Sequence, residues 1–98
     1  MIRINAGLVL DTEISGLYLY NETFDGRPSY KHESLALFLW YGGWWKVDTE
    51  DWYNQDKQNP IGFIKNTINV DCPEEAEIGS WHYYTNPTSD PSITVSEG

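Results

Sequence analysis

Apolar residues follow one another in short runs along the chain, and turn residues separate the runs. Aromatic and β-branched residues between Gly, Asn, Asp and Pro are typical of short strands. No stretch repeats apolar residues at the spacing of a long helix, about 3.6 residues. The predicted strands cover 2–5, 16–22, 29–33, 35–41, 44–49, one or two within 61–70, 80–84 and 93–95.

The intervening segments complete an all-β pattern. About seven to nine short strands with frequent turns predict a small antiparallel sandwich or barrel. A chain of 98 residues is the size of one domain, so we expect a single domain over 1–98 with its core over about 2–95. Both terminal segments look like strands, and we expect them to lie close together. We interpret 8–14 as a strand or an extended connection, 50–60 as a loop with at most one helical turn, and 71–79 as an acidic loop.

The stretch LALFLWYGGWWKVDTE, residues 35–50, is apolar at almost every position of its first half. Gly42 and Gly43 predict a tight hairpin with a two-residue type I′ turn, because that turn needs positive φ at both central positions. In that register Trp40 faces Trp45, and Tyr41 faces Trp44.

Alternation of side chains then divides this hairpin into two faces. The expected core face is wholly apolar and carries Phe38, Trp40, Trp45 and Val47. The other face mixes apolar and charged residues and carries Leu37, Leu39, Tyr41, Trp44, Lys46 and Asp48. That second face is either offered to a partner or covered by 50–64, with Trp52, Ile61, Phe63 and Ile64 against Leu37 and Leu39.

Aromatic residues make up 15% of the chain, including five Trp and seven Tyr, which is more ring surface than we expect a core of this size to hide. Exposed apolar patches usually mark partner surfaces, and Tyr and Trp are favoured anchors there. We therefore expect a non-catalytic protein-interaction or structural module whose partner surface is formed by Leu37, Leu39, Tyr41, Trp44, Trp52 and Tyr53. The alternative is a carbohydrate-binding module that stacks sugars on a platform of Trp44, Trp52 and Tyr53 beside Asn54 and Gln55. A third interpretation is that every aromatic ring has a structural role within the protein itself.

The chain has fifteen acidic and only six basic residues, which gives a net charge of −9. This charge limits the classes of partner that we expect. Nucleic acid and anionic membrane surfaces need clustered Lys and Arg, so neither is expected. No apolar run approaches the ~20 residues of a membrane-spanning helix, and the N-terminus lacks the features of a signal peptide. The chain is then either intracellular or a module excised from a larger protein. A partner protein with basic patches, or a neighbouring module, fits this charge.

The order of several motifs resembles a small all-β module of large multidomain proteins, many from protists and marine invertebrates. Its pattern joins a Gly-x-Tyr strand, a Gly-Arg-Pro-x-Tyr turn, an aromatic strand, a Trp-x-Val strand, a late Trp and a closing Thr-Val strand. The matching positions are Gly16, Tyr18, Asp25, Gly26, Arg27, Pro28, Tyr30, Trp40, Trp45, Val47, Trp81, Thr94 and Val95. The resemblance implies a scaffold or interaction module without catalytic residues. We expect structural roles for Arg27, Pro28, Tyr30, Trp40, Trp45 and Trp81, with Arg27 held against Tyr18, Tyr30 or a nearby acid.

Other candidate chemistry is sparse. His32 and His82 lie far apart and lack a third ligand at metal-site spacing, and Cys72 lacks a catalytic context. The acidic stretches 48–51 and 71–77 offer oxygens to a cation such as calcium, but neither follows the twelve-residue loop pattern of a helix–loop–helix calcium site. We expect no enzyme and no cofactor.

Overall fold

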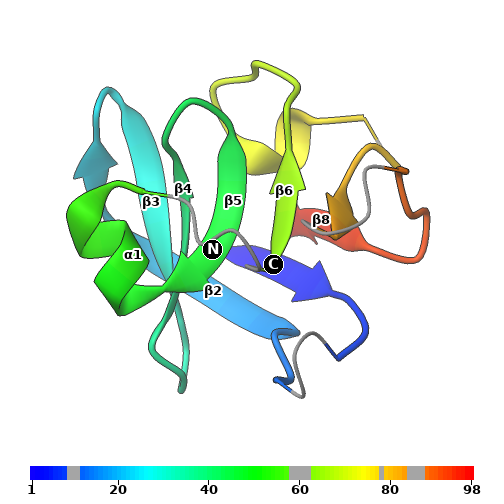
Figure 1. The fold of residues 1–98 in the computed structure, drawn as a ribbon, viewed down its shortest axis with the longest axis horizontal. Helices are drawn as coiled ribbons and strands as arrows, with labels where there is room; N and C mark the ends of the chain where they lie inside the picture. Colours follow the sequence, from blue (N-terminus) through cyan, green and yellow to red (C-terminus); the bar gives the residue numbers. More distant parts are fainter. Residues whose placement is uncertain (9–11, 58–62, 78, 84–87) are drawn as a thin grey trace.

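Eight strands form one antiparallel sheet in the order β7-β6-β5-β4-β3-β2-β1-β8 (Figure 1). The structure, a computed structural model, describes residues 1–8, 12–57, 63–77, 79–83 and 88–98. The strands are β1 (Ile2–Asn5), β2 (Gly16–Phe24), β3 (Arg27–His32), β4 (Leu37–Tyr41), β5 (Trp45–Thr49), β6 (Ile64–Asn66), β7 (His82–Tyr83) and β8 (Thr94–Glu97). The helices are α1 (Glu50–Gln55) and the short 3-10 helix η1 (Pro73–Glu75). The all-β prediction is confirmed, and the sheet curls into a half-barrel. None of the described helices is long and apolar enough to cross a membrane.

The turn between β2 and β3 follows directly from its sequence. Asp25 and Gly26 both have positive φ, 50° and 85°, and they connect the paired residues Phe24 and Arg27. Two left-handed residues match the twist of a hairpin, which is why an Asp-Gly pair forms this turn. Pro28 fits here because β4 pairs with β3 only at Tyr30 and Lys31, so its missing N–H leaves no gap in that ladder.

The chain ends meet in neighbouring strands. β1 pairs with β2 on one side and with β8 on the other. The amide of Gly98 donates a hydrogen bond to the carbonyl of Met1 at 3.0 Å, and Figure 1 shows the two termini side by side. The expectation that the terminal segments lie close together is confirmed.

The hairpin between β4 and β5 has its turn where the glycines predict it, but the register prediction is wrong. Tyr41 pairs with Trp45 and Trp40 with Lys46, so the loop holds three residues, Gly42 to Trp44, rather than two. Only Gly43 has positive φ, at 88°. The partners predicted for Trp40 and Tyr41 are therefore each displaced by one residue.

A one-residue slip exchanges the two faces of a strand. Trp45 and Val47 point to the same side as Leu37 and Leu39, into the main core. Phe38 and Trp40 point to the other side, into a second cluster with Tyr53. β4 is apolar throughout because both of its faces are covered.

The main core fills the concave side of the curled sheet. It combines side chains from both terminal strands, the central strands and the late Trp, namely Ile2, Ile4, Ile14, Tyr18, Tyr30, Leu37, Leu39, Trp45, Val47, Phe63, Ile64, Trp81 and Ile93.

The second cluster lies under α1 on the convex side. Tyr53 stacks on Phe38 with ring centroids 4.3 Å apart and meets Trp40 edge-on at 5.2 Å. Phe24 and Trp52 pack around this cluster. The segment after β5 therefore covers Phe38 and Trp40, not Leu37 and Leu39 as predicted. Phe63 and Ile64 do share the main core with both leucines, whereas Ile61 lies outside the described residues.

Candidate binding site beside strand β8

Half of the predicted partner surface lies inside the protein. Leu37 and Leu39 are 4% and 0% exposed in the main core, and Tyr53 is 5% exposed in the second cluster. The prediction that these three side chains meet a partner is wrong, because α1 and the curl of the sheet cover them.

The other predicted surface residues are half-buried and have separate neighbours. Tyr41 lies under the guanidinium of Arg27, 3.8 Å from its ring centroid. The ring of Trp44 has the amino groups of Lys46 and Lys65 at 4.9 and 4.8 Å. Trp52 packs against the second cluster from α1. These positions place Trp44 in the hairpin turn and Trp52 on the helix, each with its own protein neighbours.

The aromatic residues expected to be structural occupy core positions. Trp40, Trp45 and Trp81 are fully or almost fully buried, and Tyr30 is 7% exposed. The indole of Trp45 donates to the carbonyl of Val70 at 2.9 Å, and that of Trp40 donates to the carboxylate of Asp56 at 3.2 Å.

The polar candidates are engaged in structural contacts. His32 bonds the Ser15 carbonyl through Nε2 and accepts the amides of Ser34 and Leu35 at Nδ1, all within 3.1 Å. Asp48 is buried, and its carboxylate accepts the amide of Thr49. Across the described part of the chain, no three His, Cys, Asp or Glu side chains come together as a metal site would require.

Lys46 is buried on the convex side, where its amino group donates to the carbonyl of Gly42 at 2.9 Å. Desolvation lowers the pKa of Lys46, while the charges of Asp56 and Asp48 oppose that shift. Lys46, expected on the mixed face of the hairpin, therefore supports the β4–β5 turn from within.

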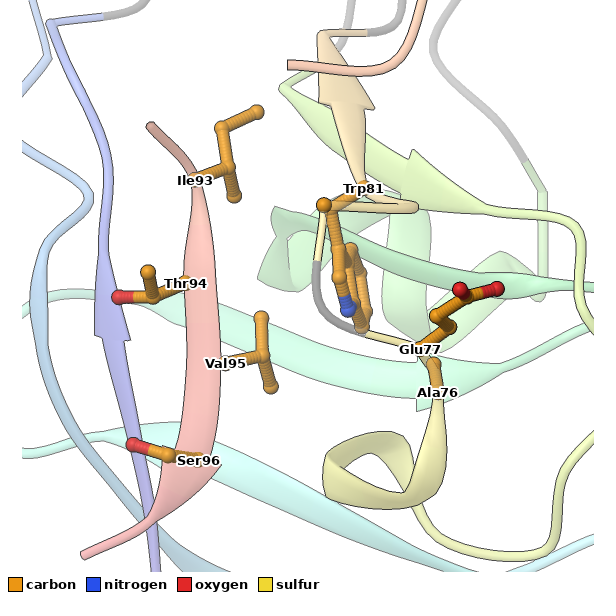
Figure 2. Close-up of a pocket in the computed structure, with 8 residues that line it drawn as sticks. Ala76, Glu77, Trp81, Ile93, Thr94, Val95 and Ser96 are labelled. Carbon is orange, nitrogen blue, oxygen red and sulfur yellow. The ribbon is translucent and has the colours of Figure 1, made fainter. Parts of the chain in front are cut away.

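A pocket of about 250 Å³ opens between β8 and the segment 76–81 (Figure 2). Ile93 and Val95 form one wall, and Trp81, Ala76 and Glu77 form the other. Figure 2 shows Ile93 and Val95 directed toward Trp81, whereas Thr94 and Ser96 point back toward β1. The walls are mostly apolar, and we call this feature the β8 groove.

The backbone along the β8 groove is an open sheet edge. Among the strands of the described residues, β8 ends the order and pairs only with β1. The bond from Gly98 to Met1 makes that opposed pair a hydrogen-bonded one. Because such pairs alternate in antiparallel ladders, the backbone groups of Ser96 and Thr94 also face β1, and the N–H and C=O groups of Val95 and Glu97 point away from β1, along the edge that adjoins the groove.

One acidic residue lines the β8 groove, and others lie on the adjoining elements. Glu77 lines the pocket, and Glu97 follows Val95 by two residues on the same face of β8. η1 packs against β8 and contributes Glu74 and Glu75. None of the six basic residues belongs to the described lining of the pocket.

Sequence reasoning missed this site apart from the structural assignment of Trp81. Residues 93–95 looked like an ordinary last strand and 71–79 like an acidic loop. The sequence pattern that could have indicated an amphipathic strand here is the alternation of Ile93 and Val95 with polar residues, which ends at Glu97. That pattern does not reveal which other segment lies beside the strand.

Comparison with known proteins found no matching family model, no matching curated protein and no matching solved structure. Function is therefore inferred from the β8 groove itself. The groove combines the backbone edge of β8 with a mostly apolar pocket and nearby acidic residues.

Proposed function

We propose that this chain is a non-catalytic protein-binding module that adds an extended segment of a partner protein to its sheet along β8. The observation that carries the proposal is the outward-facing backbone of Val95 beside the pocket walled by Trp81. In strand addition, backbone hydrogen bonds supply affinity and a pocket for one side chain supplies specificity.

The size of the pocket favours a side chain over a small molecule. Sites for drug-sized ligands usually have volumes of about 300–1,000 Å³. A pocket of about 250 Å³ suits one large apolar side chain. The strand that carries this side chain needs backbone partners, and β8 supplies them.

The opposite edge of the sheet is a weaker candidate. β7 has only two residues, His82 and Tyr83, whereas β8 has four. Short edge strands are one way in which proteins avoid unwanted pairing. β8 is the longer edge and the one that adjoins a pocket.

The experiment pans an unbiased library of displayed twelve-residue peptides against the protein and maps the enriched peptides by amide chemical shifts. We expect shifts concentrated at Ile93 to Glu97 and at Trp81. Enrichment of no peptide, or shifts confined to α1 and β4, would contradict the proposal. A glycan panel followed by Trp fluorescence tests the carbohydrate alternative, and a saturable response there without any peptide binding would also overturn it.

Val95→Pro is the diagnostic variant because it removes the outward N–H without removing a bond to β1. Val95→Ala is its matched control, since it trims the side chain and keeps the N–H. Binding should fall far more with Pro than with Ala, while thermal melts report that both variants fold. Leu19→Ala, at an exposed position of β2, controls for loss of apolar surface outside the groove.

A further inference from the structure

The charge around the β8 groove indicates what kind of segment binds there. Resting on the proposed function, we infer that the partner segment has a basic–x–apolar–x–basic pattern. Its central apolar side chain enters the pocket, and its two basic side chains meet the acidic residues beside it.

The spacing follows from strand geometry. Side chains two residues apart lie on the same face of a strand. A strand added beside β8 therefore presents one side chain opposite Val95 and its next neighbours on that face at either side. These neighbours lie opposite Glu97 on β8 and opposite Ile93, which directly precedes that strand. Glu77 belongs to the other wall of the pocket, across from Ile93 and Val95.

One carboxylate oxygen in η1, the helix that packs against β8, lacks a hydrogen-bond partner among the described residues. This atom is Oε1 of Glu74, and it is buried. Its charge contributes to raising the pKa of Tyr30, after the larger effect of burial. A cationic side chain placed near η1 would relieve this negative potential.

The same charge argues against a second copy of this chain as the occupant. Pairing β8 with β8 would bring the acidic residues of two molecules together, and each molecule carries a net charge of −9. Charged residues on an edge strand are a known barrier to self-pairing. A basic partner is attracted by the groups that repel a copy.

The test uses three synthetic peptides, acetylated and amidated. The first is Thr-Lys-Thr-Leu-Thr-Lys-Thr, the second replaces both lysines with glutamates, and the third replaces the leucine with serine. Dissociation constants are measured by NMR titration at low and high salt. We expect the first peptide to bind about tenfold more tightly than either of the others, and high salt to reduce that advantage over the glutamate peptide.

Reversing the charge of two glutamates then tests whether the preference for the lysine peptide arises in the β8 groove. In the double variant Glu77→Lys with Glu97→Lys, the glutamate peptide should bind more tightly than the lysine peptide. The control, Glu50→Lys with Asp51→Lys at the start of α1, changes the net charge equally and should keep the original order.

The outcomes separate the two proposals. Peptides from the library that bind at β8 without preference for Lys or Arg would overturn the basic pattern and leave strand addition standing. Failure of every peptide, designed or selected, would overturn the proposed function. A concentration-dependent dimer whose interface maps to β8 would identify a second copy as the occupant and would overturn the basic partner.

Discussion

The guanidinium carbon of Arg27 lies 3.8 Å from the centroid of the Tyr41 ring. The same group donates to the side-chain oxygen of Asn69 at 2.6 Å, and its Nε lies 3.9 Å from the carboxylate of Asp71. Arg27 thus connects β3, β4 and the segment before η1. The ring that it covers belongs to Tyr41, not to Tyr18 or Tyr30.

Replacing Arg27 with Ala should lower the free energy of unfolding by ~1–2 kcal/mol, because the substitution removes the cation–π contact and the bond to Asn69. Chemical denaturation followed by Trp fluorescence measures the change. Arg27→Lys is the matched control, since it keeps the charge without the planar group, and it should give an intermediate loss. Equal stability of the Ala variant and the native chain would disprove this bridging role.

The two glycines of the β4–β5 turn should respond differently to substitution. Gly43 has a φ of 88° and open space around its Cα, so Gly43→Ala should cost ~1 kcal/mol from backbone strain alone. Gly43→Asn should cost less, because Asn tolerates the left-handed region. Gly42→Ala should cost more, because its methyl group would contact the carboxylate of Asp56 and lie 3.0 Å from the Lys46 amine. Thermal melts rank the three variants. An equal loss of stability at both positions would contradict the predicted difference between backbone strain at Gly43 and crowding at Gly42.

The register of this hairpin was the main error of sequence reasoning, and its cause is physical. Register is well specified only where one face of a strand is apolar and the other polar. β4 is apolar on both faces, so its alternation does not favour either register. The deciding contacts involve Tyr53, which stacks on Phe38 from a helix that the sequence hardly signals.

Local sequence was informative where a turn depends on its own residues. The Gly-Arg-Pro-x-Tyr motif at 26–30 indicated the β2–β3 turn, and the strand-like ends predicted the meeting of β1 and β8. The β8 groove depends instead on strand order and on the return of Trp81 toward Val95. No local pattern encodes that contact between distant segments.

The hydroxyl of Tyr53 is the centre of a partly buried polar cluster beneath α1. It donates to a carboxylate oxygen of Glu22 at 2.6 Å, lies 3.1 Å from the hydroxyl of Ser29 and accepts the amide of Asn21 at 3.3 Å. Burial raises the pKa of Tyr53, and the hydrogen bond to Glu22 adds to that shift.

Tyr53→Phe should lower the free energy of unfolding by ~1–2 kcal/mol, because it keeps the ring stacking and removes the shared hydroxyl. Tyr20→Phe is a matched control, since Tyr20 is 59% exposed and its hydroxyl contacts only Thr23 among the described residues. The control should change stability by less than ~0.5 kcal/mol. Equal effects in urea titrations of the two variants would contradict a structural role for the Tyr53 hydroxyl.

Alkaline stability should depend on Tyr30. Burial, followed by the charge of Glu74, raises the pKa of Tyr30 from its ordinary value of 10.0 to about 12. A raised pKa means that the folded state holds the phenol proton more tightly than the unfolded state does. The resulting stabilisation is complete below pH ~10 and is lost as the pH rises toward ~12, since the unfolded chain releases that proton first.

Tyr30→Phe isolates this contribution, because the substitution removes the titrating hydroxyl and keeps the ring against Tyr20. Urea unfolding at pH 8, 10, 11 and ~12 gives the free energy of unfolding for both chains. The native chain should lose more stability than Tyr30→Phe between pH ~10 and ~12, so the variant gains relative to the native chain as the pH rises. Other groups titrate equally in both chains and cancel in this difference. Parallel pH profiles would mean that folding does not shift the titration of Tyr30, and they would contradict this prediction.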